Sequence, residues 1–222
     1  MELLLRMAAA VERNIGRAVE GLRERDAAVL EEVVEADREV DLAELRIDEL
    51  CIAHLALRAP IGRDLRWVVS TLKIVKDVER VGDIAKSIAR HGLEMFRDRP
   101  VAFRPEIADM ARRAQALLRS SLDAFVARDA GAARRALAED DELDRLYRET
   151  LDRLTLRMRE DPAGVPGLAH YLSICKFLER VGDHSCNIAA MVVFLVEGVD
   201  IRHRRKQPGA ENPIGDVRRV SD

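Results

Sequence analysis

The sequence Glu-Arg-Val-Gly-Asp occupies residues Glu79–Asp83 and returns one hundred residues later as Glu179–Asp183. The match extends to the longer frame Lys-x-x-Glu-Arg-Val-Gly-Asp-x-x-x-x-Ile-Ala, which covers Lys76–Ala89 and Lys176–Ala189. Repetition on this scale indicates one structural unit used twice. We therefore expect two similar halves, each carrying the same glutamate–aspartate pair for the same purpose.

The composition favours an all-α chain. Hydrophobic residues make up 48% and charged residues 35% of the 222 positions. Alanine, leucine, arginine and glutamate dominate, and these side chains lose little entropy in a helix. Glycine and proline are few and lie at breaks in the helical pattern, and the alternation typical of strands is missing from the sequence.

Apolar spacing predicts six long helices, three in each half. The first half should contain helices over about residues 2–23, 27–58 and 65–96, and the second over about 105–127, 130–160 and from the turn at 161–166 to 197. Asp26, Asp64 and Asp129 are the expected N-caps. Short connections favour a tandem repeat of two antiparallel three-helix bundles, with domains at 1–98 and 104–200 and a flexible tail at 201–222.

The charge pattern argues against nucleic acid as a partner. The net charge is −3 and aromatic residues are 4%, so neither a basic face nor a set of stacking aromatics stands out. The short basic run 202–206 is expected to be solvated. Three cysteines without metal-like spacing and no run of ~18 apolar residues predict a soluble, cytoplasmic protein.

Four acidic pairs continue apolar rows of the predicted helices, where charges are costly unless paired or bound to a cation. Members of each pair are four residues apart and so point to one side of a helix. The pairs Asp37/Asp41 and Glu79/Asp83 are equally far from the turn at Pro60. The pairs Asp140/Asp144 and Glu179/Asp183 are equally far from the turn at 161–162. Antiparallel packing would therefore create two sites, composed of Asp37, Asp41, Glu79 and Asp83, and of Asp140, Asp144, Glu179 and Asp183.

Carboxylate sets of this kind suit divalent or trivalent ions such as Mg²⁺, Mn²⁺, Ca²⁺ or iron, with Zn²⁺ less distinctive, and four carboxylates can bridge more than one ion. The alternative is a ladder of ion pairs with the neighbouring Lys76, Arg80, Lys176 and Arg180. His184 and Asn187, which follow the second motif, are candidates to support the metal ligands of the second site without binding the ion themselves.

No nucleophile–base arrangement or glycine-rich phosphate loop is found in the sequence, and the Glu-x-x-His pair of di-iron bundles is missing. We therefore do not expect an enzyme.

Together these residues resemble the PhoU family, the accessory and regulatory proteins of bacterial phosphate uptake. The similarity covers residues 1–200 and is strongest at Ala59–Arg66, at Leu72–Asp83 and at Phe177–Ala189. It implies two three-helix bundles whose Glu/Asp-x-x-x-Asp motifs, here the eight acids above, bind metal clusters. The histidine and asparagine usual after the first motif are replaced by Ile84 and Ser87.

The resemblance also implies a function as a negative regulator of phosphate uptake and of the phosphate-starvation response. The implied partners are the ATPase subunit of the phosphate ABC transporter, a sensor histidine kinase and a second copy of the chain, with the protein peripheral to these membrane complexes. Two alternatives are a metal-binding helical scaffold without a role in phosphate signalling and a metal-dependent enzyme.

Overall fold

The computed structural model describes residues 1–97 and 100–202, and these residues form six long α-helices without a strand. The bounds are α1 (Glu2–Glu24), α2 (Ala27–Arg58), α3 (Gly62–Met95), α4 (Pro105–Ala127), α5 (Ala130–Glu160) and α6 (Val165–Glu197), with a short 3-10 helix, η1 (Pro162–Gly164), before α6. The predicted all-α class and the six helices are confirmed.

Two of the three predicted N-caps are confirmed. The Asp26 carboxylate accepts a hydrogen bond from the backbone N–H of Val29 at 3.2 Å, and Asp129 accepts one from Ala132 at 2.9 Å. Both bonds satisfy a donor that the first turn of a helix otherwise leaves open.

The prediction for Asp64 is wrong, because α3 already begins at Gly62 with Ile61 as its N-cap. Ala59 and Gly62 have φ angles of 41° and 55°, which reverse the chain within a few residues and let the helix start early. Asp64 instead lies in the first turn of α3, where its charge suits the helix dipole.

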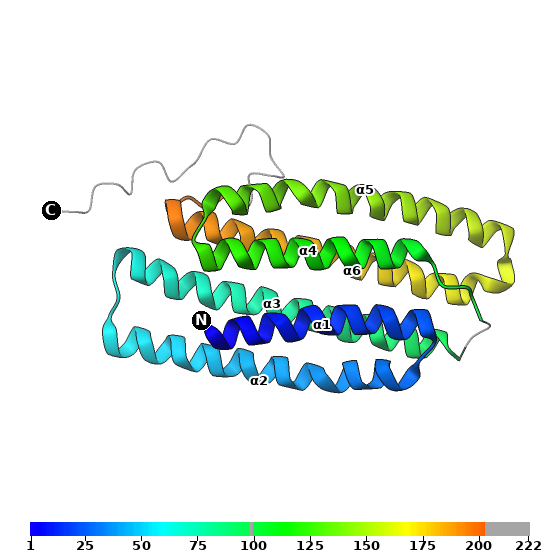
Figure 1. Ribbon diagram of the computed structural model, residues 1–222, viewed down its shortest axis with the longest axis horizontal. Coiled ribbons are helices and arrows are strands. Elements are labelled where there is room, and N and C mark those ends of the chain that lie inside the picture. Colours follow the sequence, from blue (N-terminus) through cyan, green and yellow to red (C-terminus); the bar gives the residue numbers. More distant parts are fainter. Residues whose placement is uncertain (98–99, 203–222) are drawn as a thin grey trace.

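The helices form two layers, α1–α3 and α4–α6, that lie side by side along their length (Figure 1). The layers meet where α3 packs on α6 and α1 packs on α4. Helices α3 and α6 are antiparallel, because His91 contacts Phe177 towards one end and Lys73 lies over the Phe194 ring towards the other. Val81 and Val181, the central residues of the repeated motif, are fully buried.

Within the described part of the chain, none of the helices is both long enough and apolar enough to cross a membrane. Residues 98–99 and 203–222 lie outside the described residues. The predicted flexible tail, except 201–202, and most of the basic run 202–206 therefore lie outside them as well.

Candidate metal centres and the groove between the repeats

The first acidic cluster consists of Asp37 and Asp41 on α2 and Glu79 and Asp83 on α3. Asp37 is only 2% exposed and packs against Gly82, where a Cβ atom would lie 3.4 Å from its Oδ1. Burial is the main cause of the raised pKa of Asp37, and charge repulsion from Asp41 and Asp83 adds to it, so both acids are within electrostatic reach of Asp37. The two helices thus meet at the level that the turn at Pro60 predicted.

A lysine that sequence reasoning missed lies inside this cluster. The Lys86 ammonium donates a hydrogen bond from Nζ to Oδ2 of Asp37 at 2.5 Å. This bond is the main reason why the pKa of Lys86 is raised, so the ammonium keeps its charge. Burial nevertheless raises the pKa of Asp37, since the loss of solvation outweighs the attraction to Lys86.

Other cations pair with the first cluster at its edge. Lys76 Nζ lies 3.2 Å from Glu79 and 3.0 Å from Glu44, and Arg80 lies 3.2 Å from Asp83. Burial of Glu79 raises the pKa of its carboxyl, with Lys76 opposing the shift. The ion pairs of Lys76 and Arg80 with the acids, which were the alternative to metal binding, are therefore formed in the first repeat.

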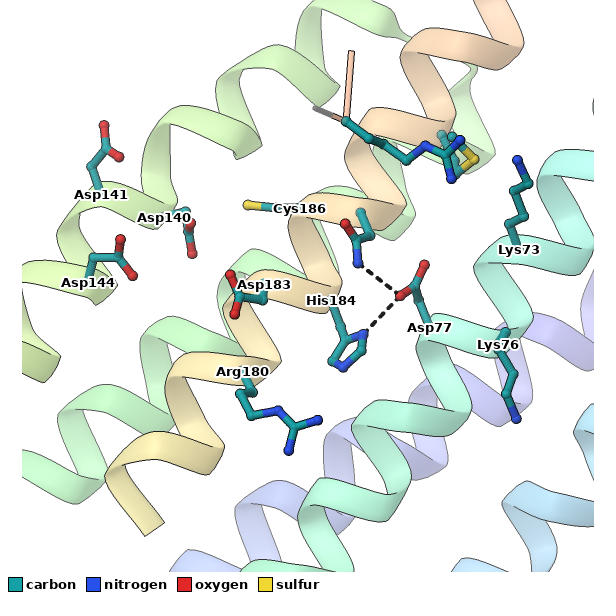
Figure 2. Close-up of a pocket in the computed structure, with 13 residues that line it drawn as sticks. Lys73, Lys76, Asp77, Asp140, Asp141, Asp144, Arg180, Asp183, His184 and Cys186 are labelled. Carbon is teal, nitrogen blue, oxygen red and sulfur yellow. Dashed lines mark hydrogen bonds and ion pairs between the residues drawn. The ribbon is translucent and has the colours of Figure 1, made fainter. Parts of the chain in front are cut away.

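The second acidic cluster consists of Asp140 and Asp144 on α5 and Glu179 and Asp183 on α6. Asp140 is 4% exposed, and a Cβ atom on Gly182 would lie 2.6 Å from its Oδ1, closer than real contacts allow. The glycine is therefore what permits the carboxylate to approach the α6 backbone. Asp140, Asp144 and Asp183 line one groove (Figure 2). Glu179 instead accepts a hydrogen bond from Lys176 at 2.6 Å.

The two clusters differ at one position that the repeat makes easy to compare. Cys186 occupies the place of Lys86, one hundred residues on, and it is buried at the groove wall with its sulfur directed towards α5 (Figure 2). At this position the second cluster therefore has a thiol where the first has an ammonium group. The donor set of the second cluster fits a divalent cation, while in the first cluster Lys86 already supplies a positive charge beside Asp37.

The groove has a volume of about 880 Å³ and is formed by α3, α5 and α6 together with Arg202, which follows α6. On its α3 side, Asp77 Oδ1 lies 2.9 Å from His184 Nδ1 and accepts a hydrogen bond from Asn187 Nδ2 at 3.2 Å (Figure 2). His184 and Asn187 thus join the two repeats. Their support of a metal site stays a prediction, as does metal binding by the eight acids.

Asp77 was missed because its counterpart in the second half is Phe177, so the repeat gave no reason to select it.

One further group of residues was missed because it, too, has no counterpart in the other repeat. Among the described residues, the only three or more potential metal ligands with donor atoms within 4.8 Å of one another are His91, Glu94 and His170. No three acids of the two clusters, as the structure describes them, bring donor atoms within 4.8 Å of one another.

A family model for the PhoU domain matches residues 4–91 and 107–192. This chain belongs to the PhoU family. Two curated PhoU relatives are similar over most of their length. The "Phosphate-specific transport system accessory protein PhoU homolog" of Pseudomonas aeruginosa PAO1 is 34% identical over 218 residues, covering 96% of this chain and 90% of the relative. The "Phosphate-specific transport system accessory protein PhoU" of Escherichia coli K12 is 31% identical over 200 residues, covering 90% and 83%.

Solved PhoU structures have the same fold. The crystal structure of PhoU from Pseudomonas aeruginosa superposes with a TM-score of 0.84 at 34% identity, over 89% of this chain and 95% of that one. The phosphate transport system regulatory protein PhoU from Streptococcus pneumoniae gives a TM-score of 0.83 at 26% identity, over 90% and 94%. The resemblance to the PhoU family read from the repeated motif is confirmed.

Proposed function

We propose that this protein is an accessory protein of a phosphate-specific transport system and a negative regulator of the phosphate-starvation response. The observation that carries the proposal is the likeness to PhoU proteins of that name, which extends over nine-tenths or more of this chain. In this proposal the protein relays the state of the transporter's ATPase subunit to a sensor histidine kinase, and represses the response when phosphate is plentiful.

The second acidic cluster is the proposed cation site in this function. Mg²⁺ or Mn²⁺ bound there would neutralise the oxygens of Asp140, Asp144 and Asp183 and hold α5 against α6. Carboxylate oxygens are the ligands that these hard cations prefer, and Gly182 lets one of them lie close to the helix backbone. In the first cluster Lys86 performs the neutralising task for Asp37 without a metal.

Long helices and firm contact between the repeats suit a protein that acts by docking. Asp77 with His184 and Asn187 on one side, and Glu12 with Arg119 and Gln115 on another, tie the two layers together. A partner that binds one layer would therefore also affect the position of the other layer. The extended surface of two layers leaves room for a transporter subunit and a kinase, and for a second copy of the chain.

A deletion strain tests the regulatory role. Without the gene, the phosphate-starvation response should be on in phosphate-rich medium, and the wild-type gene should restore repression. A tagged protein should co-purify with the ATPase subunit and with the kinase. Repression that is unchanged by the deletion would contradict the proposal and favour a scaffold without a role in phosphate signalling.

The cation site is tested in the same strain with the variant Asp144→Asn/Asp183→Asn. We expect it to fold and to repress less well than the matched pair Asp41→Asn/Asp83→Asn in the first cluster. Equal repression by both variants would argue against a role of the second cluster. Turnover of a phosphate ester by the metal-loaded protein would instead favour the alternative of a metal-dependent enzyme.

A further inference from the structure

Two histidines from different repeats meet at the interface between the layers, away from both acidic clusters. His91 lies near the end of α3 and His170 near the start of α6, and their Nδ1 atoms are 3.0 Å apart. Glu94 lies one helical turn beyond His91, with Oε2 4.0 Å from His170 Nδ1. All three donor atoms lie within 4.8 Å of one another.

The separation of the two nitrogens matches that of ligands on a common metal ion. Zn²⁺ binds imidazole nitrogen at about 2.0–2.1 Å, which places two ligand atoms of a tetrahedral site about 3.3 Å apart. The observed 3.0 Å needs only a small adjustment. Two imidazoles and one carboxylate are also a donor set used by catalytic zinc sites and by non-haem iron sites, which keep positions open for water.

The surroundings suit an ion that enters from solvent. The two histidines are partly buried, and the Phe177 ring packs beside His91 with 5.2 Å between ring centroids, while Glu94 is exposed. An apolar wall on one side limits the movement of the imidazole. The exposed carboxylate can then close on an ion from the solvent side.

We propose that His91, Glu94 and His170 form a binding site for a single Zn²⁺-like transition-metal ion that links the two repeats. In the metal-free state one Nδ1–H donates to the other Nδ1. Metal binding through both Nδ1 atoms moves that proton to Nε2 of the same ring by exchange with water, so that both imidazoles stay neutral and no net proton is released. Because the ligands come from α3 and α6, the ion would clamp one layer to the other.

The internal repeat shows that this site is single. Under the one-hundred-residue offset, His91 corresponds to Met191 and His170 to Ser70, which do not form an equivalent pair of imidazoles. The ion would therefore clamp one end of the α3–α6 interface and leave the other end unclamped. This site is independent of the acidic clusters and of the proposed function.

The test is metal titration of the full chain after removal of bound metal with a chelator. Zn²⁺ affinity is measured by competition calorimetry, and Co²⁺ is used as the spectroscopic probe, since nitrogen-ligated Co²⁺ of low coordination number absorbs far more strongly than Co²⁺ held by six oxygens. We expect one tightly bound Zn²⁺ per chain, distinct from any cation held by the acidic clusters, and the strong cobalt spectrum. His91→Gln and His170→Gln should each weaken Zn²⁺ by roughly 100-fold or more and abolish that spectrum.

His54→Gln is the matched control, because His54 is an exposed histidine on α2 far along the sequence from the site, and it should leave both readouts unchanged. Glu94→Gln, at an exposed position where folding should not suffer, should weaken Zn²⁺ by about tenfold or more. The same affinity and spectrum in wild type, His91→Gln and His170→Gln would overturn the proposal. A wild-type protein that gives only the weak oxygen-type cobalt spectrum would overturn it too.

Discussion

Asp37 and Lys86 form an ion pair across α2 and α3, with 2.5 Å between Oδ2 and Nζ, and Asp37 is almost completely shielded from solvent. The corresponding position in the second repeat is Cys186. The two acidic clusters share the repeated motif, but at this position the first has the ammonium group of Lys86 and the second has the thiol of Cys186. A cation bound at the second cluster would supply there the kind of positive charge that Lys86 supplies at the first.

Replacing Lys86 with methionine should destabilise the protein by about 3 kcal/mol, because it leaves the Asp37 carboxylate buried without its partner. The free energy of unfolding, measured by urea titration at neutral pH, checks this. The double variant Lys86→Met/Asp37→Asn should recover most of the loss, since it removes the charge as well as its partner. A loss below about 1 kcal/mol in the single variant would show that the pair is not needed for stability.

Cation binding should be unequal between the two clusters. We expect Asp144→Asn/Asp183→Asn to weaken Mn²⁺ binding strongly, by roughly tenfold or more, because it removes two of the groove carboxylates. Asp41→Asn/Asp83→Asn should have a smaller effect, since Lys86 already neutralises Asp37. Isothermal titration of both variants measures this, and the reverse order of effects would contradict it.

The two motif glycines should respond differently to alanine. A Cβ atom at position 182 would lie 2.6 Å from Asp140 Oδ1 and 2.7 Å from Leu143 Cδ2, and both side chains are buried. Gly182→Ala should therefore cost about 1–2 kcal/mol net, despite the higher helix propensity of alanine.

At position 82 the nearest atom would be Val40 Cγ1 at 3.0 Å, so Gly82→Ala should be within about 1 kcal/mol of wild type. Urea unfolding of both variants gives the comparison. Mn²⁺ titration of Gly182→Ala should also show weaker binding, because Asp140 is displaced. Equal stability of the two alanine variants would show that Asp140 and Leu143 can move away from position 182 at little cost in free energy.

Acidification should weaken the end of the interface that holds the two histidines. The pKa of His91 is lowered from 6.5 by burial and by His170 on α6, with Glu94 on α3 opposing. From about pH 6.5 down to the lowered pKa the unfolded chain therefore binds more protons than the folded chain, and the free energy of unfolding falls as the pH drops over that window.

Urea unfolding of metal-free wild type and His91→Gln between about pH 7.5 and 5.5 measures this effect. The wild type should lose more stability over that range than the variant, which lacks the titrating group. Parallel curves for the two proteins would show that His91 does not contribute. The exposed-site variant His54→Gln, which should follow the wild type, is the control.

The sequence by itself determined the helices, the repeat and the pairing of α2 with α3 and of α5 with α6. These depend on local quantities: the helical period, the caps at Asp26 and Asp129, and the distance of each acidic pair from its turn. For that reason the contact of Asp37 with Gly82, and that of Asp140 with Gly182, could be expected from residue numbers.

Only the tertiary structure decided which residues of the two repeats contact each other. The contacts of His91 with His170 and of Asp77 with His184 join residues 79 and 107 positions apart. No short turn fixes the register between α3 and α6, which depends on how two complete apolar faces pack together. Lys86 was missed because its long side chain reaches Asp37 from a neighbouring position on α3, a matter of packing that the helical period does not encode.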